Sequence, residues 1–127
     1  MTFYHQIVLK MAREIYPKGY LCTQVIKAKT FIAEHYADNI NVGDIAGEAF
    51  LSKFHFIRVF KNHYGVTPHQ YLMRVRVQEA KKLLQTGMPV AGVCFAVNFE
   101  SVPSFTRLYK KATGTTPFAF QNKSNFG

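Results

Sequence analysis

Apolar side chains recur at three- and four-residue intervals along most of this chain, which is the pattern of amphipathic α-helices. Turn-forming residues interrupt the pattern at short intervals, as at Gly19, at Asp38-Asn39 and at Gly87. No segment of useful length alternates apolar and polar residues with the period that is typical of a β-strand. The pattern predicts an all-α fold of about seven or eight helices.

The interruptions divide the chain into separate helical segments. The expected helices cover residues 3–15, 23–37, 42–49, 52–65, 67–85, 90–97 and 101–114, and a stub covers 117–121. In the segment 23–37, the apolar spacing predicts a buried set of Val25, Ile26, Ile32 and Tyr36. Residues 1–22 are either an extra helix packed on the domain or part of a linker, and both interpretations remain open.

One stretch of the sequence occurs twice. Ser52–Pro68 reads SKFHFIRVFKNHYGVTP, and it returns at Ser101–Pro117 as SVPSFTRLYKKATGTTP. Identical residues occupy Ser52/Ser101, Phe56/Phe105, Arg58/Arg107, Lys61/Lys110, Gly65/Gly114, Thr67/Thr116 and Pro68/Pro117, and Phe60/Tyr109 is a conservative pair. Because each copy of a repeat is one supersecondary unit, the sequence predicts the same device used twice.

Each copy has the start and stop signals of a helix. A serine in each copy is placed to act as an N-cap, and a glycine follows where the helix closes through a left-handed residue. The spacing predicts a core face with Phe56, Val59, Phe60 and His63 in the first copy and Phe105 and Tyr109 in the second. The opposite face of the first copy carries Lys53, Phe54, Ile57, Arg58 and Lys61.

A short helix, a tight turn and a longer capped helix together form a helix-turn-helix. The short helix over 42–49, capped by Asn41, and the turn at Phe50-Leu51 complete the first unit. The predicted division is an N-terminal helix or linker stub (1–22), a first helix-turn-helix subdomain (23–66), a linker helix (67–86), and a second helix-turn-helix subdomain with a C-terminal stub (87–127).

The positive charge of the chain is concentrated in its second part. Residues 1–50 carry five basic and five acidic side chains, whereas residues 51–127 carry eleven basic residues against Glu79 and Glu100. The net charge of +9 therefore lies in the repeat region. Such asymmetry indicates a polyanionic partner, with nucleic acid ahead of an anionic membrane.

Candidate chemistry outside this basic region is sparse. Cys22 and Cys94 form no CxxC motif and lie among apolar residues, so we expect both to be core fillers in a reducing compartment. His35, His55, His63 and His69 are too scattered to bind a metal. Paired carboxylates, an activated nucleophile and a phosphate-binding loop are not found in the sequence. We therefore expect that the chain is not an enzyme and that it binds no metal or cofactor. We also expect that it has no membrane-spanning segment and is located in the cytoplasm.

The chain resembles the DNA-binding domain of the AraC/XylS family of bacterial transcription regulators. The motifs that carry the resemblance are Ile45-Ala46, Ser52-x-x-x-Phe56-x-Arg58-x-Phe60-Lys61, Gly65-x-Thr67-Pro68, Tyr71-Leu72, Arg76, Ala80-x-x-Leu83-Leu84, Val93, Val97-Asn98-Phe99, Ser101, Phe105-x-Arg107-x-Tyr109-Lys110-Lys111 and Gly114-x-Thr116-Pro117. The resemblance implies sequence-specific binding of double-stranded DNA in the regulation of transcription, with activation as the expected direction. It also implies that two reading helices enter successive major grooves, about 34 Å apart.

The resemblance further assigns roles to individual residues. By position, base contacts are expected from Phe54, Ile57, Arg58, Val102, Pro103, Ser104 and Arg107. Phosphate contacts are expected from Ser52, Lys53, His55, Lys61, Lys110 and Lys111. RNA polymerase is a second candidate partner, no small-molecule effector site is evident, and the chain is expected to bind DNA as a monomer.

Several alternatives stay open. Arg58 is a base reader or a structural arginine paired with Glu48 or a helix C-terminus. In the second copy, Val102 and Pro103 lack hydrogen-bond donors at positions that face bases, which predicts that this unit contributes phosphate binding more than sequence discrimination. The alternative for the whole chain is a non-specific architectural module that binds nucleic acid through the same charge.

Overall fold

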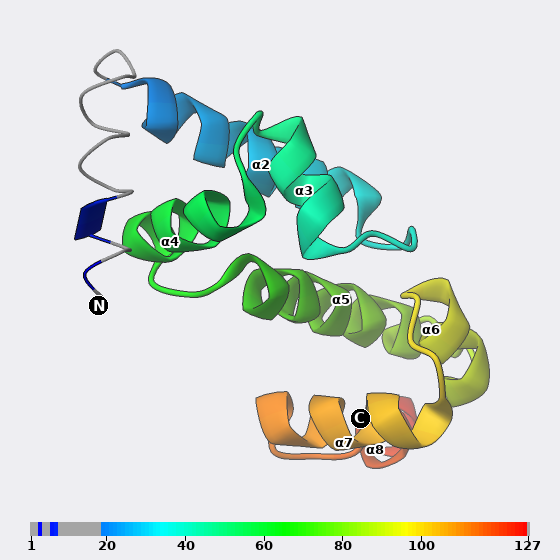
Figure 1. The fold of residues 1–127 in the computed structure, drawn as a ribbon. Helices are drawn as coiled ribbons and strands as arrows, with labels where there is room; N and C mark the ends of the chain where they lie inside the picture. Colours follow the sequence, from blue (N-terminus) through cyan, green and yellow to red (C-terminus); the bar gives the residue numbers. More distant parts are fainter. Residues whose placement is uncertain (1–2, 4–5, 8–18, 127) are drawn as a thin grey trace. The chain divides into compact units, whose positions relative to one another are not determined.

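The computed structural model describes residues 3, 6–7 and 19–126. Within this part of the chain it contains seven complete α-helices and no β-strand, which confirms the predicted all-α fold (Figure 1). The helices are α2 (Tyr20–His35), α3 (Val42–Glu48), α4 (Lys53–Tyr64), α5 (Pro68–Gln85), α6 (Val90–Ala96), α7 (Val102–Thr113) and α8 (Pro117–Phe126). Most of the helix predicted over residues 3–15 lies outside the described residues. The three described positions in this range, 3, 6 and 7, are helical.

The chain divides into two compact units. Unit 1 takes residues 1–34 and 40–71, and unit 2 takes residues 35–39 and 72–127. Helix α5 passes from the first unit to the second after Tyr71. Each unit contains one short helix and one longer helix joined by a turn, with α3 and α4 in unit 1 and α6 and α7 in unit 2.

The interior of unit 1 is built from α2, α3 and α4. Its buried apolar residues are Val25, Ala28, Ile32, Ile45, Ala46, Ala49, Leu51, Phe56, Val59 and Phe60. Helix α3 packs against α4. Gln24 is also buried, and its Nε2 donates to the carbonyl oxygen of Ala49 at 2.9 Å. This bond satisfies the carbonyl at the end of α3, so α2 fixes the position of the turn that leads into α4.

The interior of unit 2 is one apolar cluster shared by α5, α6 and α7. Its buried members are Val77, Ala80, Leu84, Val93, Cys94, Val97, Phe105 and Tyr109. Helix α8 packs against α7. The side chain of Gln121 from α8 donates to the carbonyl oxygens of Leu84 (3.1 Å) and Met88 (2.6 Å). Gln121 thereby satisfies carbonyls at the end of α5 that have no partner within the helix.

A buried arginine holds the turn after α2. Arg76 lies in α5 and is 7% exposed, and its Nε donates to the carbonyl oxygen of Tyr36 at 2.8 Å. Its Nη2 donates to the carbonyl oxygen of Asp38 at 3.1 Å. Burial lowers the pKa of Arg76, but the guanidinium stays charged at neutral pH. The two carbonyls therefore compensate for the removal of this charge from water.

The predicted capping residues occupy the helix ends. Ser52 and Ser101 accept hydrogen bonds from the backbone N–H groups of His55 and Ser104, respectively, each at 3.3 Å. Gly65 and Gly114 close α4 and α7 with φ angles of 77° and 86°. The capping box at the start of α5 is also confirmed, since Thr67 and Gln70 exchange hydrogen bonds of 3.0 and 3.1 Å.

The structure corrects several predicted faces and one boundary. Ile26 is 51% exposed and Tyr36 is half-buried, whereas the interior positions of α2 are taken by Gln24 and Ala28 as well as Val25 and Ile32. His63 is exposed and does not share the buried face of Phe56 and Phe60. The C-terminal stub is a helix that extends to Phe126, beyond the predicted end at 121.

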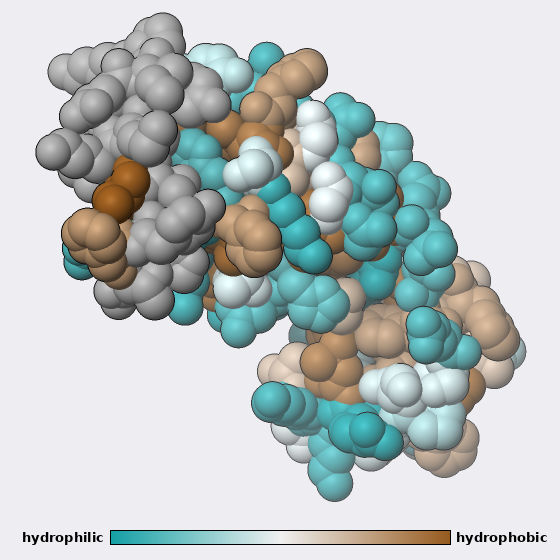
Figure 2. Space-filling view, viewed as in Figure 1, coloured by the Kyte–Doolittle hydropathy of each residue, from teal (hydrophilic) through white to brown (hydrophobic). Residues whose placement is uncertain are grey.

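Apolar side chains also reach the surface. Figure 2 shows hydrophilic residues over much of the visible face, with apolar patches among them. The large apolar side chains that are well exposed in the described helices and turns include Ile26, Phe50, Phe54, Phe95 and Phe118. Among the described helices, none is both long enough and apolar enough to span a membrane.

Candidate nucleic-acid interface

Helix α4 presents part of the predicted interface of unit 1. Phe54, in the first turn, is 71% exposed, and Lys53 and Lys61 are also exposed. Ile57 and Arg58 are half-buried. The opposite side of α4 is fixed in the interior by Phe56 and Phe60, whose rings lie 5.6 Å apart. The aromatic pair thus anchors the helix and leaves its other side available for a ligand.

His55 is the one predicted contact of unit 1 that the structure places in the interior. Only 6% of its surface is exposed, and burial lowers the pKa of the imidazole. A neutral, buried imidazole does not fit the predicted contact with a phosphate, which a charged and accessible donor makes best. The sequence places His55 beside Phe56 in the first turn of α4, and only the packing of α4 shows that its side chain turns inward.

Helix α7 presents the corresponding surface of unit 2. Pro103, Ser104, Arg107, Lys110 and Lys111 are all exposed. Val102 is different, because it is half-buried and packs against the apolar cluster of unit 2. Only part of the Val102 side chain is therefore accessible for the base contact that the sequence predicts. The exposed charges of α7 lie in its middle, at Arg107, and in its last turn, at Lys110 and Lys111.

Two serines organise the start of α7. The Ser101 hydroxyl accepts from the backbone N–H of Ser104 and donates to Ser104 Oγ at 3.0 Å. With its oxygen already accepting, the Ser104 hydroxyl keeps its own hydrogen for donation to an outside acceptor. Ser104 is exposed, so that acceptor can be a base edge or a phosphate oxygen.

The turns of the two units follow the same backbone path up to one extra residue. Phe50 and Asn98 both have positive φ angles, of 54° and 63°. Just after them, the backbone N–H of Leu51 donates to the Ala46 carbonyl at 3.1 Å, and that of Phe99 donates to the Cys94 carbonyl at 2.9 Å. In sequence, the N-caps Ser52 and Ser101 are separated by one residue more than Phe50 and Asn98 are.

Glu100 is therefore an additional, exposed residue directly before the cap of α7. The sequence comparison at one constant spacing missed it. The signal was available, because the buried pairs Ile45/Val93 and Ala46/Cys94 match only at the shorter spacing. The insertion adds an acidic side chain at the start of the second reading helix, where unit 1 has none.

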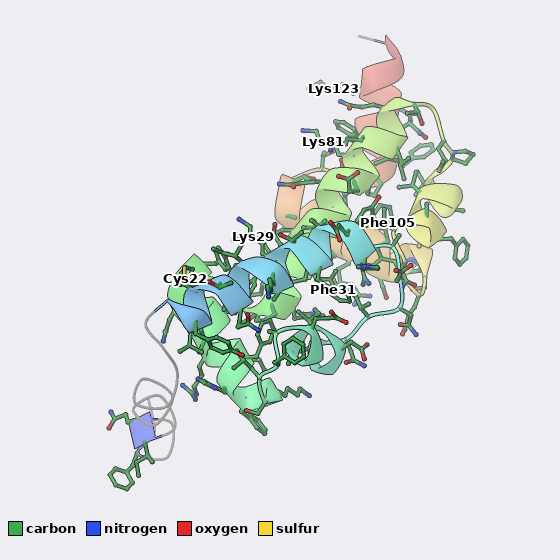
Figure 3. The ribbon with its side chains drawn as sticks, turned by 90° about the horizontal axis from the view of Figure 1, so that it is seen from above. Cys22, Lys29, Phe31, Lys81, Phe105 and Lys123 are labelled. Carbon is green, nitrogen blue, oxygen red and sulfur yellow. The ribbon has the colours of Figure 1, made fainter. Side chains whose placement is uncertain are left out.

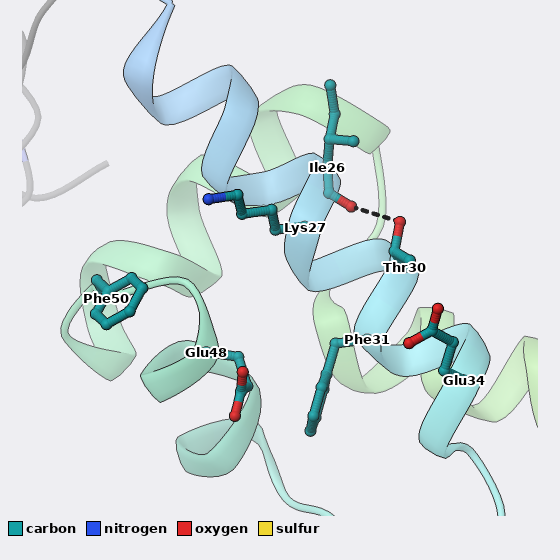
Figure 4. A pocket seen from close by; sticks show the side chains of 7 residues that line it. All are labelled: Ile26, Lys27, Thr30, Phe31, Glu34, Glu48 and Phe50. Atoms are coloured by element: carbon teal, nitrogen blue, oxygen red, sulfur yellow. Dashed lines mark hydrogen bonds between the residues drawn. The ribbon is translucent and has the colours of Figure 1, made fainter.

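Unit 1 also contains an open groove that is separate from the predicted DNA-contacting residues (Figure 4). It has a volume of about 440 Å³ and is lined by Ile26, Lys27, Thr30, Phe31, Glu34, Glu48 and Phe50. These residues come from α2, α3 and the turn that follows α3, and none of them is a predicted reader. The prediction that this chain lacks an effector site stays a prediction. Within the described residues, no group of three or more side chains is placed to hold a metal ion.

A family model described as a helix-turn-helix domain matches residues 45–123. The chain is 33% identical over 92 residues to the probable transcriptional regulator LumQ of Photobacterium leiognathi, an alignment that covers 72% of this chain and 37% of LumQ. The chain thus spans well under half the length of this relative.

Solved structures show the same fold. One is a transcriptional regulator of Chromobacterium violaceum, described as AraC-type, with a TM-score of 0.75 and 24% identity over 80% of this chain and 92% of that one. Another is the DNA-binding domain of the global transcriptional factor AdpA in complex with a target DNA. Its TM-score is 0.74 and its identity 26%, and the match covers 78% of this chain and 90% of that one.

Proposed function

The chain belongs to the AraC/XylS family of helix-turn-helix regulators, and from this premise we propose that it binds double-stranded DNA sequence-specifically to regulate transcription. The observation that carries the proposal is that the same kind of basic helix occurs once in each unit, at α4 and at α7. In both units, a serine-capped helix is anchored by two buried aromatic rings, and it carries an arginine that is half-buried at Arg58 and exposed at Arg107, together with exposed lysines. The structural neighbour AdpA is described in complex with a target DNA, which supports the same use of this fold.

The two units divide the work in this proposal. In unit 1, Arg58 grips guanine O6 and N7 with two donors, and Phe54 and Ile57 make apolar contacts such as one with a thymine methyl. In unit 2, Ser104 and Arg107 are the polar side chains nearest to the bases. The two helices enter successive major grooves about one turn, or about 34 Å, apart, so that one molecule reads an asymmetric site.

Phosphate contacts supply most of the affinity and little of the specificity. Ser52, Lys53 and Lys61 of unit 1 and Lys110 and Lys111 of unit 2 make them, and all five are accessible. The capped N-termini of α4 and α7 add backbone N–H groups that favour an anion. The excess of basic residues after position 50 supports this assignment.

Further properties belong to the proposal as well. The chain acts as a monomer on DNA, in the cytoplasm, as an activator that contacts RNA polymerase, and not as an enzyme. The names of the relatives as transcription regulators support the regulatory role. The exposed apolar side chains outside α4 and α7, such as Ile26 and Phe118, are surface on which a protein partner can bind.

Selection of binding sites from random duplex DNA tests the proposal directly. The purified chain is used at one fixed salt concentration of about 150 mM, because phosphate contacts make affinity depend steeply on salt. We expect enrichment of one asymmetric motif with two blocks about 10 base pairs apart. Measurable binding without any enriched sequence would refute sequence-specific recognition and would favour the architectural alternative.

A further inference from the structure

A cysteine and a histidine meet on the surface of unit 1, and neither is among the residues assigned to DNA. Cys22 lies in the first turn of α2, and His63 lies in the last turn of α4. The Sγ atom of Cys22 is 3.4 Å from Nε2 of His63, which is hydrogen-bonding distance for sulfur. Cys22 is only half-buried and His63 is exposed. The expectation that Cys22 is a core filler is therefore wrong.

The neighbour of the Cys22 thiol is a potential base. The Nε2 atom of His63 can accept the thiol proton when the ring's own proton is on Nδ1. The thiol and the imidazole come from different helices, since α2 carries Cys22 and α4 carries His63. Figure 3 shows Cys22 near the start of α2, with Lys29 further along the same helix.

Aromatic rings fix the position of His63. Its ring packs edge-on against the ring of Tyr64 with centroids 5.3 Å apart, and Tyr64 packs on Phe60 at 4.8 Å. The ammonium of Lys29 lies over the ring of Tyr64, 4.8 Å from its centroid. Burial, followed by the nearby Cys22 and Tyr71, raises the pKa of Tyr64, so its hydroxyl stays neutral beside the thiol. His63 is thus held in place although it is exposed.

The other cysteine of the chain has the opposite environment. Cys94 is fully buried in the apolar cluster of unit 2, and its thiol donates to the carbonyl oxygen of Phe99 at 3.7 Å. Burial raises the pKa of Cys94, which disfavours the reactive thiolate. One protein therefore contains an accessible thiol with a base beside it and a buried thiol without one.

We propose that Cys22 is a site of thiol–disulfide exchange with small disulfides, and that His63 is its proton acceptor. His63 takes the thiol proton, and the Cys22 thiolate attacks one sulfur of the small disulfide. A new S–S bond forms to Cys22 as the old S–S bond breaks, and the departing thiolate takes the proton from His63. Cys22 is oxidised to a mixed disulfide, and the other half of the small disulfide is reduced to a thiol.

The test measures the rate of this exchange on the complete, reduced chain at pH 7. The probe is dithiodipyridine, an aromatic disulfide whose released thione absorbs light. We expect one thiol to react rapidly in the native protein and the second only after denaturation. Cys22→Ser should abolish the rapid reaction, and Cys94→Ala should leave it unchanged. Mass spectrometry after incubation with glutathione disulfide should find a single adduct, on the peptide that contains Cys22.

Replacement of the histidine separates activation from mere accessibility. His63→Gln should slow the rapid reaction on the order of tenfold, because the thiol loses its base while it stays exposed. His69→Gln, which removes another exposed histidine of unit 1, is the matched control and should have no effect. Thermal unfolding of each variant checks that the fold is retained. A rapid reaction that survives Cys22→Ser, or a His63→Gln variant that reacts as fast as the unaltered chain, would overturn the proposal.

Discussion

The two helix-turn-helix units have nearly the same interior and different reading surfaces. Phe56 and Phe60 in unit 1 correspond to Phe105 and Tyr109 in unit 2, and all four are fully buried. The first turns of the two reading helices differ. Exposed Phe54 of unit 1 corresponds to exposed Pro103 of unit 2, and buried His55 corresponds to exposed Ser104. The repeat therefore preserves what holds each helix in place and changes what each helix offers to a ligand.

The turns before the reading helices show a second difference. The same left-handed backbone conformation is taken by Phe50 in unit 1 and by Asn98 in unit 2. Asparagine tolerates this conformation, whereas for a bulky aromatic residue it is an outlier. Unit 2 then inserts Glu100 before its cap. Unit 1 is thus strained in its turn, and unit 2 carries an acidic residue directly before α7, the helix that we propose faces DNA.

The largest expected effect tests whether the two interiors are equivalent. Phe56→Ala and Phe105→Ala each remove a fully buried ring, so each should destabilise the protein by about 3–5 kcal/mol. Hydrogen exchange followed by residue should show that Phe56→Ala raises exchange mainly in α3 and α4, and Phe105→Ala mainly in α6 and α7. Equal loss of protection in all helices from either change would show that the units unfold as one body.

The next effect concerns the two arginines. Arg58→Ala should lower the preference for the best site by about 1–3 kcal/mol, because a bidentate base contact is lost. Arg107→Ala should instead weaken binding to all sequences to a similar extent. The measurement is a binding-site selection followed by titrations on the best and a scrambled duplex.

Arg58→Lys is the control for charge, because lysine keeps the positive charge but not the planar pair of donors. It should lose base preference while it keeps binding to the scrambled duplex. If Arg107→Ala rather than Arg58→Ala flattens the preference, the proposed division between the units is wrong. If Arg58→Ala mainly lowers the thermal stability, Arg58 is a structural arginine.

A smaller effect is expected from the turns. Phe50→Gly should stabilise unit 1 by roughly 1 kcal/mol, because glycine adopts a positive φ without the steric cost that phenylalanine meets. The ring of Phe50 is 75% exposed, so little buried area is lost. Asn98→Gly is the matched change in unit 2 and should have less effect. Chemical denaturation of both variants checks the prediction, and equal shifts would argue against strain at Phe50.

The smallest effect concerns the one polar atom that distinguishes the two aromatic pairs. The hydroxyl of Tyr109 is buried without a hydrogen-bond partner in the described structure, and burial raises the pKa of this tyrosine. Tyr109→Phe gives unit 2 the residue that unit 1 has at Phe60, and it should stabilise the protein by up to about 1 kcal/mol. The midpoint of chemical denaturation is the measurement. A clear loss of stability would show that the hydroxyl has a partner in solution.

Much of the fold could be predicted from the sequence because helix ends are local features. Ser52, Ser101, Gly65 and Gly114 act on backbone groups within one turn of their own positions, and the predicted caps are confirmed. The burial of the repeated aromatic residues was also predictable, since helical spacing puts them on one side. The same reasoning identified the helices whose outer sides form the candidate interface.

Other features needed the folded chain. His55 and His63 both belong to α4, but one turns into the interior and the other meets Cys22 of α2. Val102 is predicted to face bases, but it is half-buried and packs against the apolar cluster of unit 2. The sequence by itself determined where helices begin and end and which aromatic residues anchor them, because those choices depend on neighbours along the chain. Only the tertiary structure decided the environment of each histidine and cysteine, because burial and hydrogen-bond partners come from helices that are distant in sequence.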